Sequence, residues 1–177
     1  MPRSLYLREA LRATVAVERL SKADAGRPVL FTGASLDALT LILHIESELI
    51  LHRWDIVGSD DTSIKALSDP RIGVHAAKTV AAMQPDVFPP RSGAHTTVIL
   101  RAPGCPDVAV TGGAATTIKL APNDLGHSTV ECHPAVRTLL LWGRNPEPDL
   151  PRPTGEPDVV AAVTAMLGPN GSGHGVR

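Results

Sequence analysis

The residues from 44 to 55 include the side-chain types that bind divalent metals. Glu48 and His52 are four positions apart, so on a helix they share one face, about 6 Å apart, and can reach one ion. His44 lies on the same face, but eight residues of helix rise about 12 Å, too far for His44 and His52 to share an ion. Asp55, three positions after His52, can orient that imidazole. We therefore expect a two-ligand metal site, with a solvated polar helix face as the alternative.

A catalytic zinc ion usually takes three protein ligands and a water, so this pair needs a third ligand. His75 lies in a separate predicted helix, His95 and His127 flank predicted strands, and His174 lies near the C-terminus. Of these four, His75 is the best candidate for the third ligand. Ordinary surface or boundary positions are the alternative for all of them.

The two cysteines predict neither a disulfide framework nor a zinc ribbon. Cys105 and Cys132 are 27 positions apart without a CxxC pattern, and such thiols suit a reducing cytoplasm. His133 follows Cys132, but neighbours on a strand point to opposite faces, so we expect no nucleophile–base pair. Cys105 lies between Gly104 and Pro106, where a turn is expected.

The metal-binding pattern requires a helix, and the sequence predicts one from Ser35 to Val57. Ser35 is a good N-cap, Asp37 suits the first turn, and Gly58 follows where a left-handed cap is expected. Further helices are expected at residues 4–24, 62–68 and 72–83, and a short strand at residues 29–32.

The second half of the chain is much richer in proline than the first half. Thirteen of the 16 prolines follow residue 84, and residues 85–91 are typical of a linker. Short strands are expected at residues 96–101, 108–111, 116–120 and 128–132, and helices at residues 134–142 and 156–167. This order predicts an α+β fold of two unlike parts. The parts are a helical domain at residues 1–84 and an α+β domain at residues 92–167, followed by a flexible tail at residues 168–177.

Composition limits the partners and the location of the protein. The formal charge is −1 at pH 7 without a basic cluster, which argues against nucleic acid and anionic membranes as partners. Residues 36–51 are the most apolar stretch, but two glutamates and a histidine interrupt it, so we expect no membrane span. The charged N-terminus does not suit a signal peptide. We expect a soluble cytoplasmic protein with a core of Leu, Val, Ile and Ala, because aromatic residues make up only 3% of the chain.

Two stretches resemble the signatures of one enzyme family. ELILHRWDIVG, residues 48–58, is similar to the motif that ends the helical domain of the mycothiol-dependent maleylpyruvate isomerase-like family. LLLWGR, residues 139–144, is similar to the hallmark of that family's second domain. The tripeptide TGE at residues 154–156 then precedes a final helix, as it does in the family. The resemblance covers roughly residues 5–167.

The resemblance implies a DinB-like four-helix bundle joined to a small α+β domain similar to sterol carrier protein 2. It implies that Glu48 and His52 bind zinc together with a His of an earlier bundle helix, and that the ion binds the thiol of mycothiol and favours its thiolate. In the isomerase the thiolate would add to a double bond of the substrate, allow rotation and leave again. Arg144 would bind anionic groups, as the candidate catalytic and cofactor-binding residue. Its alternative role is to bond the last carbonyls of its helix.

Compared with the family pattern, the chain begins near the penultimate bundle helix, so we expect the earlier helices and their histidine to be absent. A misplaced start codon or a broken gene would also remove them. The expected function is that of a divergent or truncated member, with zinc-assisted thiol chemistry on a small electrophile as an isomerase or transferase. Activity would then need a homodimer or a partner that supplies the missing helices. The alternative is a non-catalytic module that binds an apolar ligand or dimerises through an exposed helix face.

Overall fold

The computed structural model describes residues 19, 26–31, 34–83, 96–113, 116–121, 127–146, 148 and 150–167. This described part has five helices and two sheets, which confirms the expected α+β class. The chain divides into two compact units, Met1–Leu49 and Ile50–Arg177. The linker predicted at residues 85–91, the tail predicted at residues 168–177 and nearly all of the helix predicted at residues 4–24 lie outside the described residues.

A two-stranded hairpin precedes the long helix that begins in the first unit. Strand β1 (Pro28–Phe31) pairs antiparallel with β2 (Ala34–Asp37), and helix α2 (Ala38–Val57) begins directly afterwards. The Asp37 carboxylate accepts hydrogen bonds from the backbone N–H and the hydroxyl of Thr40, both at 2.8 Å, as an N-cap residue does. The prediction that Ser35 caps this helix is therefore wrong, because Ser35 is a paired residue of β2.

The end of α2 and the next two helices agree with the sequence prediction. Gly58 follows α2 with φ +80°, in the left-handed region. Asp60 then caps α3 (Asp61–Leu67), and its Oδ1 accepts a hydrogen bond from the Ser63 backbone N–H at 2.8 Å. Helix α4 (Pro70–Met83) follows after a short turn. Both shorter helices thus lie within two residues of their predicted positions.

The four strands predicted in the second half form one sheet. They are β3 (Thr97–Arg101), β4 (Asp107–Thr111), β5 (Thr117–Ala121) and β6 (Ser128–Glu131). Their order is β5-β4-β3-β6, in which β3, β4 and β5 are antiparallel neighbours and β6 runs parallel to β3. Burial alternates along β4, as expected for a strand that turns one face to the core.

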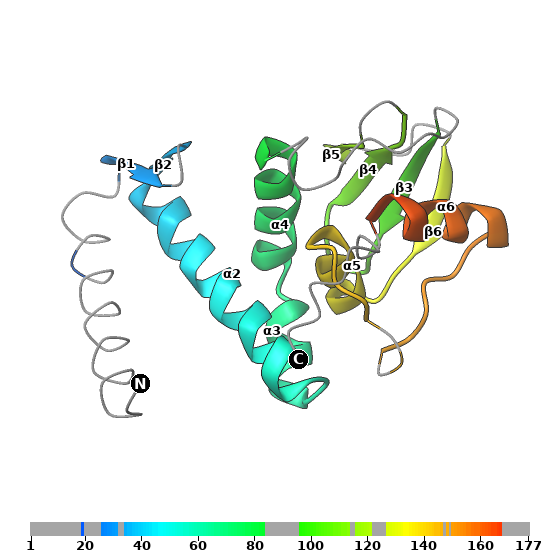
Figure 1. Cartoon of the computed structure of the whole chain (residues 1–177), viewed down its shortest axis with the longest axis horizontal. Coiled ribbons are helices and arrows are strands. Elements are labelled where there is room, and N and C mark those ends of the chain that lie inside the picture. Colours follow the sequence, from blue (N-terminus) through cyan, green and yellow to red (C-terminus); the bar gives the residue numbers. More distant parts are fainter. Residues whose placement is uncertain are drawn as a thin grey trace. The chain divides into compact units, whose positions relative to one another are not determined.

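Helices α5 (Pro134–Leu141) and α6 (Pro157–Leu167) complete the second unit. Figure 1 shows α4 and α5 beside the sheet, and α4 contacts both α5 and β5. Helix α3 contacts α5, and α6 contacts β6. The two predicted C-terminal helices are therefore confirmed, and each has a partner element within this unit.

One hydrophobic core connects these elements. It is mainly aliphatic, as expected, and it contains residues of α3, α4, α5 and the sheet, among them Leu67, Ala77, Val110 and Leu139. The sequence prediction grouped α3 and α4 with a helical domain at residues 1–84, whereas here they pack on α5 and β5. The reason is that their apolar faces are buried in this core, so the division between compact units lies inside α2.

Candidate functional site

Two of the predicted site residues lie near the C-terminal end of α2. The Oδ2 atom of Asp55 is 3.6 Å from Nδ1 of His52, and the His52 side chain is 65% exposed. This separation is slightly longer than a hydrogen bond. Asp55 is therefore placed to attract an Nδ1–H of the exposed His52 imidazole.

Arg144 is positioned by the way in which α5 ends. Gly143 has φ +67°, and its N–H donates to the Leu140 carbonyl at 2.9 Å, while the Arg144 N–H donates to the Leu139 carbonyl at 2.9 Å. These two bonds form a Schellman motif with glycine in the left-handed position. The glycine of the LWGR stretch thus has a backbone role, and the turn that it makes carries Arg144 out of the helix.

Arg144 and Asp55 form a two-point ion pair, although they are 89 positions apart in the sequence. Nε of Arg144 donates to Oδ1 of Asp55 at 3.0 Å, and Nη2 donates to Oδ2 at 2.9 Å. Nη1 donates to the Trp142 carbonyl at 3.3 Å, so Arg144 also bonds the end of its own helix, which was the alternative role expected for it. The Arg144 side chain is 28% exposed, so solvent screens this pair only partly.

The donors for a metal ion form an incomplete set. Glu48 and His52 both lie on α2 with the predicted spacing, and one carboxylate and one imidazole are donor types that zinc accepts. Among the residues that the structure describes, no group of three or more His, Cys, Asp or Glu side chains could hold a metal ion. The described residues therefore fit part of a zinc site and leave at least one protein ligand to be supplied from elsewhere.

His75, the best remaining candidate for a third ligand, is buried in α4 at 5% exposure. Its Nε2 lies 3.2 Å from the Thr79 hydroxyl, one turn later in the same helix. This contact gives His75 a local role within α4. His95 and His174, two of the other candidates, lie outside the described residues.

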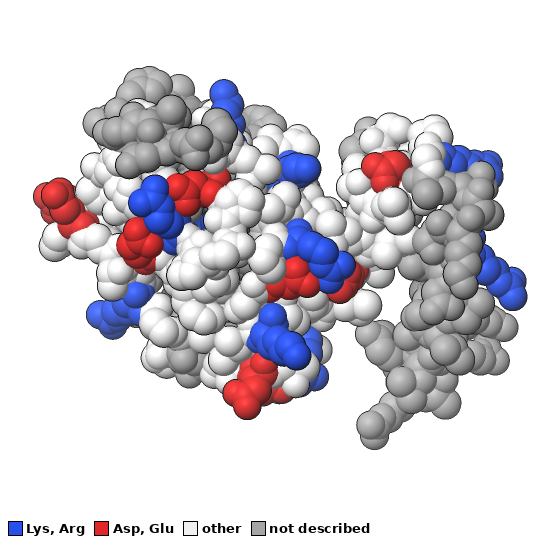
Figure 2. All heavy atoms as spheres, turned by 180° about the vertical axis from the view of Figure 1, so that it is seen from behind, with Lys and Arg blue, Asp and Glu red and all other residues white. Residues whose placement is uncertain are grey.

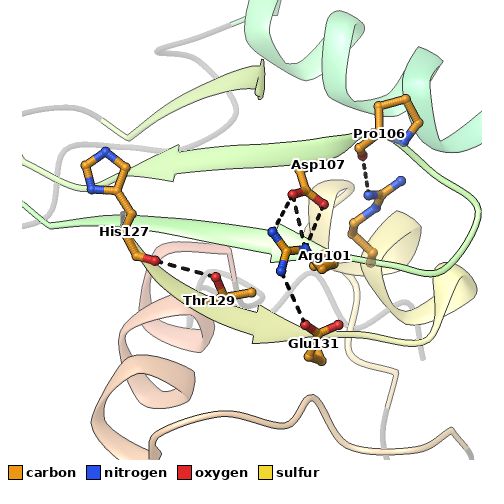
Figure 3. Close-up of polar contacts among 7 residues, drawn as sticks. Arg101, Pro106, Asp107, His127, Thr129 and Glu131 are labelled. Atoms are coloured by element: carbon orange, nitrogen blue, oxygen red, sulfur yellow. Dashed lines mark hydrogen bonds and ion pairs between the residues drawn. The ribbon is translucent and has the colours of Figure 1, made fainter. Parts of the chain in front are cut away.

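His127 and His133 flank β6, and each accepts a hydrogen bond from a residue two positions later in the chain. The His127 carbonyl accepts a hydrogen bond from the Thr129 hydroxyl at 3.5 Å (Figure 3). The Nδ1 atom of His133 accepts one from the Ala135 backbone N–H at 3.3 Å, which caps α5. Burial raises the pKa of the neighbouring Cys132 thiol to about 12. Cys132 and His133 therefore have separate structural roles, in line with the expectation that they form no nucleophile–base pair.

A charged cluster at one end of the large sheet was missed in the sequence. Nη2 of Arg101 is 2.9 Å from Oδ2 of Asp107, and its Nη1 is 3.9 Å from Oε1 of Glu131 (Figure 3). Arg101 ends β3, Asp107 begins β4, and Glu131 is the register partner of Arg101 on β6. In the sequence, each of three predicted strands has a charged residue at one end or next to it. Only the order of the strands in the sheet shows that these three charges lie close together.

A buried arginine in α5 was also missed. Arg137 is 1% exposed, and its Nη1 donates to the Pro106 carbonyl at 2.6 Å. The signal in the sequence was one arginine in the otherwise apolar helix PAVRTLLL. That pattern does not show whether the arginine side chain turns to solvent or to the core.

Elsewhere the described surface carries mixed charge. On the face seen in Figure 2, Lys and Arg side chains lie beside Asp and Glu side chains. None of the described helices is both long and apolar enough to span a membrane. Comparisons with protein-family models, curated proteins and solved structures found no match. The chemistry of the site must therefore be inferred from its own residues.

Proposed function

We propose that this chain is a divergent member of the mycothiol-dependent maleylpyruvate isomerase-like family and carries out zinc-assisted thiol chemistry on a small electrophile. The observation that supports this most is the ion pair between Asp55 and Arg144. It joins the two stretches that resemble the family, residues 48–58 and 139–144. Two unrelated similarities would have no reason to meet in the fold.

Each site residue would then have a distinct role. Glu48 and His52 would hold the metal, which when bound favours the thiolate of a thiol such as mycothiol. Asp55 would orient His52, and Arg144 would hold Asp55 in place. A guanidinium has five N–H donors, of which Arg144 uses three in its bonds to Asp55 and Trp142. The others are suited to an anionic group of the thiol or the substrate.

The described residues supply two of the three protein ligands that a catalytic zinc usually takes, so we assign no reaction step to the metal. The third ligand would come from another part of this chain, from a second copy or from a partner protein. With two ligands alone, zinc would bind weakly and exchange readily.

The metal content of the purified chain tests this proposal. In equilibrium dialysis against an excess of zinc, we expect up to about one ion bound per wild-type chain, measured by mass spectrometry of the metal. His52→Ala and Glu48→Ala should lose this ion because each removes a ligand. His127→Ala is the matched control and should retain it. Equal, near-zero metal in all four proteins would contradict the metal-binding proposal.

A second candidate function, a dimerisation module without catalysis, is favoured by the apolar residues that α2 exposes. Leu49 is 59% exposed, Ile56 84% and Val57 52%. Leu49 and Ile56 are seven positions apart, so they lie on one side of the helix. Exposed apolar side chains of this kind favour association with a second copy.

A further inference from the structure

Glu48 and His52 form half of a metal site at an accessible position of α2. They are one carboxylate and one imidazole on one face of the helix, and the His52 side chain is 65% exposed. Among the residues that the structure describes, no group of three or more His, Cys, Asp or Glu side chains completes the set. A second copy of the chain would bring the same two ligands again, which is enough for the three or four that zinc takes.

The part of α2 that is accessible lies opposite the part that packs in the core. Leu51 and Trp54 belong to the core cluster, whereas Leu49 is 59% and Ile56 84% exposed. With 3.6 residues per turn, Leu49 and Ile56 lie on the side of the helix opposite Leu51 and Trp54. We call Leu49 and Ile56 the exposed apolar line. Another molecule can therefore contact this line without disturbing the core.

Polar residues lie along both flanks of the exposed apolar line. From the turn of the helix, Glu48 and His52 lie on one flank, and Glu46 and Arg53 lie on the other. Arg53 also pairs with Asp60, the residue that caps α3. The accessible part of α2 thus has a pair of metal ligands on one flank and two opposite charges on the other.

This arrangement is self-complementary about the level of Ile50, the midpoint between Glu48 and His52. When two α2 helices pair antiparallel at this level, Glu48 of each copy lies level with His52 of the other. The twofold axis of such a pair keeps each flank on its own side, so all four ligands gather on one side. On the other side, Glu46 lies within about 2 Å, along the helix direction, of Arg53 of the second copy. Charge complementarity of this kind favours a second copy as the partner.

The dimensions of a helix pair allow the four ligands to meet at one ion. Glu48 and His52 are four residues apart, about 6 Å along the helix, so each lies about 3 Å from the twofold axis in this direction. Packed helices are roughly 8–10 Å apart, and each side chain needs to span about half of this distance. Helix bundles build metal sites in this way, from Glu and His side chains of facing helices.

We propose that two copies of this chain pair antiparallel through α2 and share one zinc ion, held by Glu48 and His52 of both copies. The inference rests on the proposed function and deepens it, because the second copy supplies the ligands that the described residues of one chain lack. Zinc accepts a thiolate more readily than a carboxylate. A thiol would therefore take the place of one Glu48 carboxylate, which would receive the proton of the thiol.

The zinc content and the mass of the full chain, measured together, test this inference. In equilibrium dialysis with saturating zinc, we expect one ion per two chains. Analytical ultracentrifugation should show that zinc tightens dimerisation about tenfold or more relative to a chelator, because an ion that binds only the dimer favours it. One ion per chain with an unchanged monomer mass would overturn the shared site and leave the proposed metal binding in place.

Variants separate zinc-dependent pairing from pairing by apolar contact alone. His52→Ala and Glu48→Ala should remove the effect of zinc on dimerisation, whereas His127→Ala, the matched control outside α2, should retain it. A wild-type dimer that forms equally well with zinc and with chelator would contradict the shared site and leave only the dimerisation module. A wild-type chain that binds no zinc would overturn both this inference and the proposed metal binding.

Cross-linking tests the antiparallel register. In the proposed pair, the two copies of residue 49 lie about 3 Å apart along the helix direction, and those of residue 56 about 18 Å apart. With zinc, Leu49→Cys should therefore react with a short thiol-specific cross-linker to give a dimer, and Ile56→Cys should not. Mass spectrometry of peptides distinguishes this product from cross-links through Cys105 or Cys132. Equal cross-linking at positions 49 and 56 would refute the antiparallel pairing.

Discussion

Asp55 lies close to His52 and forms an ion pair with Arg144, two residues of the proposed site. Its position three residues after His52 predicts their proximity, and the 3.6 Å separation of Nδ1 and Oδ2 agrees with it. Its pairing with Arg144 could not be predicted in the same way, because the contact joins α2 to the turn after α5. Helix periodicity relates only residues within about one turn of each other. The sequence thus identifies the residues of this site. Only the packing of α2 against the turn after α5 shows that Asp55 and Arg144 are in contact.

A double-mutant cycle measures the strength of this ion pair. Asp55→Asn, Arg144→Ala and the double variant should give a coupling free energy of about 1 kcal/mol in urea unfolding, because the contact is two-point and partly buried. The pair of Arg71 and Asp69 is the control, for which we expect about 0.3 kcal/mol because the Arg71 side chain is 64% exposed. A coupling free energy near zero for Asp55 and Arg144 would mean that the ion pair does not help to hold the site.

Helix ends show how far local sequence determines an element. Gly58 has positive φ and follows the end of α2, as its position predicts, and Gly143 has the same role after α5. The start of α2 differs, because pairing of β1 with β2 draws Ser35 into a strand and leaves Asp37 as the cap. Capping preferences therefore predict a helix start only where no neighbouring strand competes for the same backbone groups.

The cap of α3 predicts a dependence of stability on pH. The hydrogen bonds from Ser63 lower the pKa of Asp60 below its ordinary value of 3.8, and Arg53 adds to this. A carboxyl with a depressed folded-state pKa stabilises the fold above the unfolded-state value and loses this contribution as pH falls through the folded-state value. Asp60→Asn keeps an oxygen acceptor for the cap but cannot ionise.

We therefore expect wild type to exceed Asp60→Asn in melting temperature at pH 6, and this advantage to fade as the pH falls below about 4. Asp61→Asn serves as the control, since it removes the same charge from the adjacent position and leaves the cap intact. An advantage of the wild type that stays constant from pH 6 to pH 2 would show that ionisation of Asp60 does not contribute.

The second compact unit is held together by a core that no single element could form. Leu67 of α3, Ala77 of α4, Val110 of β4 and Leu139 of α5 belong to one buried cluster. Helix α2 is different, because it reaches this core with Leu51 and Trp54 and also exposes Leu49 and Ile56. The exposed side of α2 is the part of the molecule from which association would be expected.

Association through α2 can be measured by light scattering during size-exclusion chromatography. We expect a mass that rises toward that of a dimer with increasing protein concentration. Ile56→Lys should keep the chain monomeric, because it places a charge on the apolar side of the helix. Thr164→Lys adds the same charge at an exposed site of α6 and should leave association unchanged. A wild-type chain that is monomeric at all concentrations would count against the dimerisation module.

The local pattern of the sequence was sufficient for most elements. The periodicity of apolar residues, the glycines and the prolines predicted α3 to α6 and all four strands of the large sheet, because these signals act over a few residues. The spacing on α2 predicted the contact of His52 with Asp55 for the same reason. Tertiary structure alone decided that α3 and α4 belong with the sheet, that Arg144 meets Asp55, and that Arg137 bonds the Pro106 carbonyl. Each of these joins segments distant in sequence, and their meeting depends on which apolar faces share one core.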